Sequence, residues 1–248
     1  MNIIACYSNK GGVGKTATSV NLAYAMAASG KRTLLCDLDP QGASGFYFRV
    51  KPSKKLTDAA FFKDVEKFTD AIRGSDYGNL DILPANMSFR DFDVFLSRMR
   101  NSRSRLKKSL KAVKKDYDVI ILDCPPSIST LSENIFRSAD AILVPVIPTT
   151  LSQRTFEQLV AFFKDHKLPE KKLHGFFSMV QGVKTLHVDT IDAMRAAAKR
   201  RFMQTQIPFA SDIERMGIHR APVMATAPGS AAGKAYQALC DEIQDRIS

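Results

Sequence analysis

The feature that most constrains this chain is a loop rich in glycine and lysine, residues 7–16, with the sequence Tyr-Ser-Asn-Lys-Gly-Gly-Val-Gly-Lys-Thr. It follows the apolar run Asn2 to Cys6 and precedes a segment with helical spacing, Lys15 to about Ser29. Its three glycines let the backbone adopt positive φ and approach a ligand closely. Between a strand and a helix, such a loop wraps backbone N–H groups around phosphate oxygens. The sequence therefore predicts a phosphate-binding loop.

Two lysines flank the glycines of this loop. In the phosphate-loop pattern, Lys15 reaches the β- and γ-phosphates of a nucleotide and the hydroxyl of Thr16 ligates Mg²⁺. The pattern has glycine where this chain has Asn9, a mild departure because asparagine tolerates left-handed backbone. One lysine suffices to hold a γ-phosphate. Lys10 is therefore spare within its own subunit and can reach a nucleotide in another.

Short apolar runs alternate with helix-like segments along the chain. Continuous apolar strands separated by helices indicate a parallel sheet that is covered on both faces. We expect a doubly wound α/β fold, mostly parallel, with ligands at the carboxyl ends of its strands. At 248 residues and 45% hydrophobic, the chain fits one domain, residues 1–248. The predicted strands are Ile3 to Cys6, Thr33 to Cys36, Leu80 to Leu83, Val119 to Leu122, Ala141 to Val146, Phe176 to Val180 and one near Gln206 to Pro208.

Acidic side chains follow two of these strands. Asp37 and Asp39 come after the second strand, and Asp123 comes after the run Val119 to Leu122. Carboxylates at strand ends can lie near the mouth of the loop, where one can position a water for attack on a γ-phosphate. A plain turn is the alternative for the pair Asp37 and Asp39, because aspartate and proline are common in turns.

The chain is strongly basic. It has 36 Lys and Arg against 25 Asp and Glu, a net charge of +11, which favours a polyanionic partner such as nucleic acid, although a basic balance also suits proteins that are merely soluble. The most basic segment, residues 98–115, holds nine Arg or Lys and no acid. Its Leu106, Leu110 and Val113 form an apolar stripe, which predicts an amphipathic helix. The charged side of that helix is either a solvated face or a DNA contact.

Other features exclude whole classes of protein. No run of eighteen apolar residues exists, so no transmembrane helix is expected, and the strand at the start leaves no signal peptide to expect. The four cysteines are widely spaced and no Cys-x-x-Cys or Cys/His cluster occurs. Buried reduced thiols in a cytoplasmic protein are therefore favoured over disulfides or a metal site.

The motifs together resemble the ParA/MinD family of ATPases. Residues 10–16 are similar to the family's deviant Walker A motif, residues 37–42 to its Walker A′ motif, and residues 117–127 to its Walker B strand and the Pro-Pro segment that follows. The resemblance implies ATP and Mg²⁺ as cofactors. It implies that Lys10 crosses the interface of an ATP-bound dimer and acts in catalysis with Lys15 and Asp39.

The resemblance also assigns roles to individual residues. It implies that Asp39 orients or activates the attacking water, while Thr16, Asp37 and Asp123 serve Mg²⁺, the acids through water. The family usually carries a second hydroxyl residue where this chain has Ala17, so the grip on nucleotide is altered there. The residues implied to contact nucleotide are Lys10, Gly11, Gly12, Val13, Gly14, Lys15, Thr16, Ala17 and Pro208.

The function implied is that of the short ParA form, which lacks an N-terminal helix-turn-helix domain. An ATP-bound homodimer binds nonspecific double-stranded DNA, and a ParB-like or cargo-adaptor protein stimulates slow hydrolysis. Such a cycle positions a plasmid, a chromosome origin or a protein complex such as a carboxysome, in the cytoplasm over the nucleoid. By region of the chain, the resemblance places DNA contacts at Lys199, Arg200, Arg201, Arg215 and Arg220.

Two alternatives use the same fold. One is a membrane-associated spatial regulator like MinD, which is disfavoured because the predicted C-terminal helix, about Ser230 to Ile247, has small or apolar residues on one side and acids among its polar ones. The other is a metabolic or redox ATPase, such as relatives of the nitrogenase iron protein or dethiobiotin synthetase. Cys124, between Asp123 and Pro125, is poorly placed to share a cluster, and no small-substrate pocket can be identified.

Overall fold

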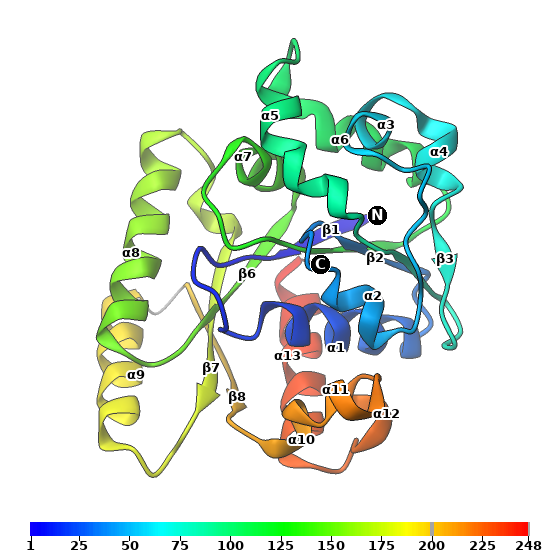
Figure 1. Cartoon of the computed structure of the whole chain (residues 1–248). Helices are drawn as coiled ribbons and strands as arrows, with labels where there is room; N and C mark the ends of the chain where they lie inside the picture. Colours follow the sequence, from blue (N-terminus) through cyan, green and yellow to red (C-terminus); the bar gives the residue numbers. More distant parts are fainter. Residues whose placement is uncertain (199–200, 248) are drawn as a thin grey trace.

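A computed structural model describes residues 1–198 and 201–247 of the chain. One mixed sheet crosses the molecule, and helices cover both of its faces (Figure 1). The strand order is β3-β4-β2-β5-β1-β6-β7-β8, and β3 pairs antiparallel with β4 while the other pairs are parallel. The predicted doubly wound α/β fold is confirmed.

The strands are β1 (Asn2–Cys6), β2 (Thr33–Asp37), β3 (Arg73–Gly74), β4 (Leu80–Leu83), β5 (Val119–Asp123), β6 (Ala141–Val146), β7 (Leu173–Val180) and β8 (Phe202–Pro208). The α-helices are α1 (Lys15–Ala28), α2 (Ala43–Tyr47), α3 (Asp58–Lys63), α4 (Val65–Thr69), α5 (Phe92–Ser97), α6 (Arg105–Leu110), α7 (Thr130–Ser138), α8 (Thr150–Asp165), α9 (Thr185–Ala198), α10 (Ser211–Glu214), α11 (Met216–His219), α12 (Val223–Thr226) and α13 (Ala231–Ile247). Short 3₁₀ turns are η1 (Met87–Asp91), η2 (Ser102–Ser104), η3 (Lys111–Val113) and η4 (Glu170–Lys172).

All the predicted strands are present, with differences at their ends. β7 begins at Leu173 and β8 at Phe202, earlier than their apolar runs indicate. The edge strand β3 was not predicted, because two residues, Arg73 and Gly74, carry no readable pattern. Its pairing with β4 is the antiparallel exception in the sheet.

The strands read as continuous apolar runs because each one buries both of its sides. Successive side chains point to opposite faces of a sheet. Along β1, Ile3 and Ala5 belong to the core under α3–α9, whereas Ile4 and Cys6 belong to the core under α1 and α11–α13. All four cysteines are buried free thiols, as the composition predicts.

The predicted amphipathic helix over residues 98–115 is interrupted. Asn101 has φ 58, a left-handed conformation that an α-helix cannot contain, and the helical turns η2, α6 and η3 follow it. The apolar stripe itself is confirmed, since Leu106, Leu110 and Val113 are buried in the core. The spacing predicted which side chains are buried, but local backbone geometry shortened the helix.

The centre of the sheet is where the strand order reverses. β1 lies between β5 and β6, and the chain builds one half of the sheet after β1 and the other half after β6. The carboxyl ends of the central strands therefore meet at a topological switch point, the usual ligand site of such folds. The glycine-rich loop leaves β1 at this point and enters α1 (Figure 1).

The C-terminal helix α13 closes one face of the sheet. Leu239 and Ile243 are buried against the core, and Glu242 accepts hydrogen bonds from the backbone N–H groups of Gln204 and Thr205 on the edge strand β8. Its apolar side is thus committed to the fold. In residues 1–198 and 201–247, no helix is long and apolar enough to span a membrane.

The start of α13 supplies a test of this packing. A Cβ at Gly233 would lie 2.5 Å from the carbonyl oxygen of Ala227 and 2.8 Å from that of Pro228, so the backbone itself would have to move. We expect Gly233→Ala to lower the free energy of unfolding by about 1–3 kcal/mol, although Gly→Ala in a helix otherwise stabilises. Urea unfolding followed by circular dichroism measures this. The matched control is Gly217→Ala in α11, where no atom lies within 4 Å; equal stability losses in the two variants would contradict the packing described.

Candidate functional site

The loop after β1 is shaped by its glycines. Gly12 has φ 69 and Gly14 has φ 94, both in the left-handed region that other residues rarely adopt. At Gly14 a Cβ would also meet the Ser178 hydroxyl oxygen at 3.0 Å, whereas Gly11 and Gly12 face open space and are exposed. Gly14 is the N-cap of α1, and no side chain caps this helix end. Backbone N–H groups at the positive end of α1 are therefore presented without a side-chain acceptor, which is the requirement for binding phosphate oxygens.

Lys15 is held inside this loop. Its side chain is buried, and Nζ donates a hydrogen bond of 2.9 Å to the carbonyl oxygen of Lys10. Burial lowers the pKa of the ammonium group, and the nearby charges of Asp123 and Asp39 oppose that shift. The ammonium is thus held by a backbone carbonyl, a partner that a phosphate oxygen can replace with a stronger, charge-assisted hydrogen bond.

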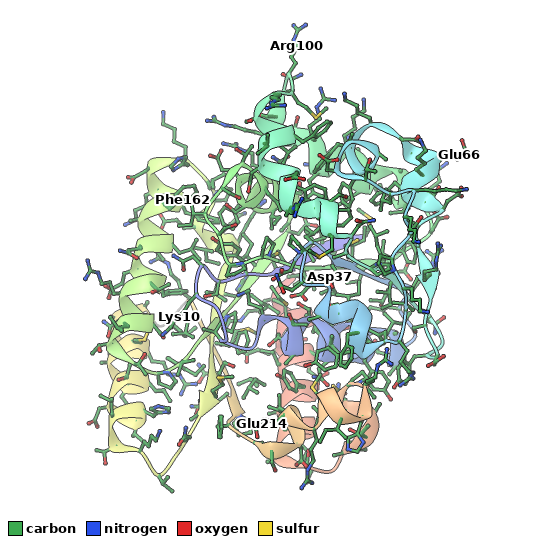
Figure 2. The ribbon with its side chains drawn as sticks, viewed as in Figure 1. Lys10, Asp37, Glu66, Arg100, Phe162 and Glu214 are labelled. Atoms are coloured by element: carbon green, nitrogen blue, oxygen red, sulfur yellow. The ribbon has the colours of Figure 1, made fainter. Side chains whose placement is uncertain are left out.

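Lys10 lies on the other side of the loop, against its own α8. Nζ donates a hydrogen bond of 3.2 Å to Ser152 Oγ in the first turn of α8, and Thr149 caps that helix (Figure 2). The N-terminal end of a helix is its positive end, which disfavours a cation. The contact is therefore weak, and the Lys10 side chain can leave it at little cost.

Asp37 and Asp123 lie side by side at the ends of neighbouring strands. They are register partners between β2 and β5, and both are buried. Asp37 accepts from the backbone N–H groups of Asp39 and Ser44, at 3.1 and 3.0 Å. Asp123 accepts from the hydroxyls of Ser44 and Ser19, at 2.7 and 3.1 Å. Figure 2 shows Asp37 near the centre of the molecule, with Lys10 to its left.

The surroundings of this carboxyl pair disfavour its ionised form. Burial raises the pKa of both carboxyls, the charge of Asp123 raises that of Asp37 further, and the charge of Asp39 acts the same way on both. The Thr16 hydroxyl opposes the shift at Asp123, so it lies close to that carboxylate. A divalent cation placed here would favour the ionised carboxylates and remove their mutual repulsion. The donor set of two carboxylates and a threonine hydroxyl fits Mg²⁺.

The protein alone does not supply a complete metal site. Among the described residues, no group of three or more His, Cys, Asp or Glu side chains could hold a metal ion. Mg²⁺ is usually bound through one or two carboxylates together with phosphate oxygens and water. The arrangement therefore suits a metal that arrives with a phosphate ligand in the loop.

Asp39 lies two residues beyond the buried Asp37 and is half-exposed. Its carboxylate accepts a hydrogen bond from the Gln41 backbone N–H at 3.0 Å, which fixes the turn that leads into α2. The alternative of a plain turn thus describes the local backbone correctly. The same turn nevertheless places a partly exposed carboxylate at the mouth of the site, because its charge reaches Asp37 and Asp123.

The remaining residues predicted to contact nucleotide are Val13, Ala17 and Pro208. Val13 is buried, and Ala17 packs partly buried on the core beside α13. The next hydroxyl, on Thr18, donates to the Gly14 carbonyl oxygen at 2.8 Å and so serves the loop backbone. Pro208 ends β8, paired with Val180 of β7, at the carboxyl edge of the sheet where the loop also lies.

The residues around the site that were not predicted from the sequence are mostly serines. Ser19 and Ser44 bind Asp123, Ser152 binds Lys10, and Ser178 faces Gly14. A signal existed for two of them: Ser19 lies one helical turn after Thr16, and Ser44 follows the second acid in the same loop. The other two come from β7 and α8, whose approach to the loop only the fold reveals.

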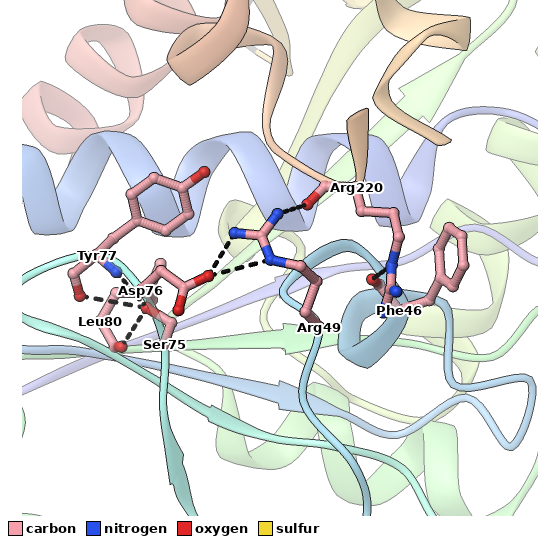
Figure 3. Close-up of polar contacts among 7 residues, drawn as sticks. All are labelled: Phe46, Arg49, Ser75, Asp76, Tyr77, Leu80 and Arg220. Atoms are coloured by element: carbon pink, nitrogen blue, oxygen red, sulfur yellow. Dashed lines mark hydrogen bonds and ion pairs between the residues drawn. The ribbon is translucent and has the colours of Figure 1, made fainter. Parts of the chain in front are cut away.

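Helix α2 connects the acid pair to the end of α11. At its start, Ser44 binds both Asp37 and Asp123. At its end, the Phe46 carbonyl oxygen accepts from Arg220 Nε at 3.1 Å, and the Arg220 guanidinium lies 4.7 Å from the centre of the Phe46 ring (Figure 3). Arg49, which pairs with Asp76, donates to the Arg220 carbonyl oxygen at 2.7 Å. Arg220 is therefore held against α2.

Lys199 and Arg200 lie outside the described residues, and the described residues predicted to contact DNA are not gathered in one place. Arg201 lies ahead of β8 and pairs with Glu170. Arg215 lies 3.9 Å from Asp212, beyond the other end of β8. A seven-residue strand is about 23 Å long, so Arg201 and Arg215 lie far apart within one subunit.

The buried acid pair leads to a pH-dependent stability effect. A carboxyl whose pKa is raised on folding stabilises the fold when protonated and loses that contribution as pH rises through the folded pKa. Without nucleotide, Asp123→Asn should therefore raise Tm by a few degrees at pH 7.5, the change that about 1 kcal/mol produces in a chain of this size. The gain should shrink as pH falls towards 4.

A control with the opposite sign is Asp118→Asn. The Arg32 side chain lowers the pKa of the Asp118 carboxyl to about 2, so its contribution is present at neutral pH and is lost as pH falls. Thermal unfolding of both variants from pH 3 to 8 makes the comparison, because the Asp118 contribution begins to fall only below about pH 4. A lower Tm for Asp123→Asn at pH 7.5, with no dependence on pH, would show that the ionised carboxylate of Asp123, buried beside Asp37, does not destabilise the fold.

Comparison with known proteins places this geometry in a family. Residues 1–174 match the family described as AAA domain. The chain is 31% identical to the sporulation initiation inhibitor protein Soj of Bacillus subtilis strain 168 over 247 residues, which cover 97% of both chains. It is 28% identical to the chromosome partitioning protein ParA of Myxococcus xanthus, over 98% of this chain and 88% of that protein.

A solved structure has a similar fold over nearly the whole chain. The cobyrinic acid a,c-diamide synthase of Mycobacterium smegmatis, with bound ATP analogue and magnesium, superposes with a TM-score of 0.82 at 26% identity, covering 98% of this chain and 94% of that chain. The glycine-rich loop, its two lysines and the paired acids thus occur in a chain that matches Soj over nearly its whole length. The protein belongs to the ParA/MinD family of P-loop ATPases.

Proposed function

We propose that this protein is an ATP-dependent switch that dimerises on ATP and Mg²⁺, binds nonspecific double-stranded DNA as that dimer, and hydrolyses ATP slowly. The observation that carries the proposal is the pairing of an uncapped phosphate loop, bearing Lys10 and Lys15, with two buried carboxyl groups whose pKa values are raised by burial. The likeness to a structure solved with ATP analogue and magnesium supports the same ligands here.

Each residue has a role in this proposal. The backbone from Gly11 to Thr16 binds the phosphates, and Lys15 exchanges its loop carbonyl for a β/γ-phosphate oxygen. Thr16 ligates Mg²⁺ directly, while Asp37 and Asp123 hold it through water. Mg²⁺, when bound, neutralises charge on the phosphates. Ala17 and Pro208 line the rest of the nucleotide, without a hydroxyl from the former.

Hydrolysis is proposed to be slow because few side chains take part in the reaction. Asp39 orients the attacking water, and as an ordinary half-exposed carboxylate it is a weak general base. Lys10 leaves Ser152 and reaches the nucleotide of the second copy, so each site is complete only in the dimer. We propose that a ParB-like protein or cargo adaptor accelerates the reaction and so returns the protein to its DNA-free state.

The cellular consequence follows from that cycle. A partner on a plasmid, a chromosome origin or a protein complex such as a carboxysome consumes the DNA-bound form locally, and the cargo moves towards what remains. The protein is then cytoplasmic and associated with the nucleoid. Relatives named for chromosome partitioning and for inhibition of sporulation initiation support a role of this kind.

Two other functions are distinguished by a binding assay. A MinD-like membrane role would need an apolar helix face at the surface, but the apolar side of α13 is buried. A metabolic ATPase is favoured by the similarity to a cobyrinic acid a,c-diamide synthase. Co-sedimentation with anionic liposomes and with DNA, each with and without ATP, separates the three: the proposed function requires that ATP increase sedimentation with DNA and that none occur with liposomes.

The two lysines of the loop form a matched pair for nucleotide binding. Lys15→Ala should weaken binding of Mg-ATP about 10- to 100-fold, because a charge-assisted contact to phosphate is lost. Lys10→Ala removes the same charge from the same loop but should leave the affinity of the monomer within about twofold of the wild-type value, since Lys10 serves the other copy. Titration with a fluorescent ATP analogue at low protein concentration measures both. Equal losses would mean that Lys10 acts in its own subunit.

Asp39 separates binding from hydrolysis. Asp39→Ala should keep nucleotide affinity and slow phosphate release about 10²- to 10⁴-fold, the usual contribution of a positioned general base. The variant should then accumulate on DNA in the presence of ATP. Release of phosphate at the wild-type rate would refute the assigned role.

A further inference from the structure

The most basic stretch of the chain presents its charges on one outer face. Leu106, Leu110 and Val113 are at most 1% exposed, so α6 and η3 have one side in the core and turn the other outward. The charged side chains of the segment are exposed, apart from half-buried Arg105. We use the name α6 basic face for Arg98, Arg100, Lys107, Lys108, Lys111, Lys114 and Lys115.

The charges of this face are not neutralised by the protein. Of the nine basic residues in 98–115, Arg103 pairs with Glu133 at 3.1 Å and Arg105 donates to the Arg100 carbonyl oxygen. Within the described part of the chain, no member of the α6 basic face has an ion pair or a side-chain hydrogen bond. Arg201, Arg215 and Arg220 differ in this respect, because each already has a partner.

The positive field extends beyond α6. Lys172, whose Nζ donates to the Ala139 carbonyl oxygen at 2.6 Å, has its pKa lowered by burial and further by the charges of Lys107 and Lys171. Lys171 and Lys172 come from η4, far along the sequence from α6. Asp140 is the acid that opposes them there.

The face is remote from the nucleotide site and from the end of β8. In Figure 2, Arg100 projects from the opposite end of the molecule to Glu214, the residue before Arg215, and Lys10 and Asp37 lie between them. The face is formed by one subunit alone, so it is present in the monomer and needs no rearrangement.

We propose that the α6 basic face is a second DNA-binding surface, which holds the phosphate backbone of duplex DNA without nucleotide and without dimerisation. Residues 105–113 span about 13 Å, the length of about four base pairs. Exposed Lys and Arg at that spacing are sufficient for sequence-independent contacts with phosphates. The inference goes beyond the proposed function, because it does not depend on ATP.

Duplex DNA fits this face better than a lipid surface does. A membrane-binding helix exposes large apolar side chains beside its basic ones, but residues 98–115, all of them described, expose none, and the nearest is Val94. Exposed Ser104 and half-buried Ser102 stand among the cations instead, and small hydroxyls are frequent phosphate ligands in DNA complexes. Duplex DNA can also present a phosphate to each cation of the face, because its phosphates continue in both directions along the helix.

The test uses the full-length protein without nucleotide. Binding of a labelled duplex of about 30 base pairs is followed by fluorescence anisotropy at several salt concentrations from about 50 mM upward. The variant Lys107→Gln/Lys108→Gln/Lys111→Gln should lose about tenfold or more in affinity at the lowest salt. The slope of log affinity against log salt should fall by about two to three, since each lost phosphate contact removes about 0.9. The exposed positions should leave Tm unchanged.

A dispersed variant controls for net charge. Lys51→Gln/Lys164→Gln/Lys234→Gln removes the same charge from three separated exposed sites and should change affinity about twofold or less. Equal losses in the two variants would overturn the proposal, and so would wild-type protein that ignores duplex at the lowest salt. Binding to vesicles of neutral and anionic phospholipid, but not to duplex, would assign the face to membranes and also overturn it. If nucleotide-free binding depends on the cluster but ATP adds nothing, the proposed function fails while this inference stands.

Discussion

Two carboxyl groups buried side by side at the ends of neighbouring strands organise this molecule. Asp37 and Asp123 end neighbouring parallel strands in register, so the sheet itself brings the carboxylates together and buries them. Their hydrogen bonds to Ser19, Ser44 and the Asp39 backbone keep both in place. Burial of an ionised carboxylate is unfavourable unless a cation compensates it. Under the proposed function, a metal that binds here together with a phosphate ligand would offset this cost.

Helix α2 gives that arrangement a route to the surface. Its first turn is bonded to both acids through Ser44, and its last residues hold Arg220 through the Phe46 ring and carbonyl (Figure 3). A change at the acids that moves Ser44 would therefore also move α2 and alter its contacts with Arg220 at the end of α11. Such a connection suits a protein in which nucleotide decides what the surface binds.

The loop and the acids of the candidate site were predictable from sequence, because the spacing of residues along the chain is enough to identify them. The glycines of residues 11–14, the two lysines and the acids at strand ends are read from spacing alone, since parallel strands deliver their carboxyl ends to one edge. The contacts of Lys10 and Gly14 with Ser152 and Ser178 were not predictable, because they depend on how α8 and β7 approach the loop. The left-handed backbone at Asn101, which interrupts the helix predicted over residues 98–115, was likewise not predictable from the apolar stripe.

The central claim is that the loop and acid pair bind Mg-ATP and that Lys10 then joins two copies. Sedimentation velocity of the wild-type protein measures this directly, with Mg²⁺ and either ADP or a nonhydrolysable ATP analogue. The account predicts a 27.5 kDa species with ADP and a species of twice that mass with the analogue. A single 27.5 kDa species under both conditions, at protein concentrations well above the micromolar range, would contradict it.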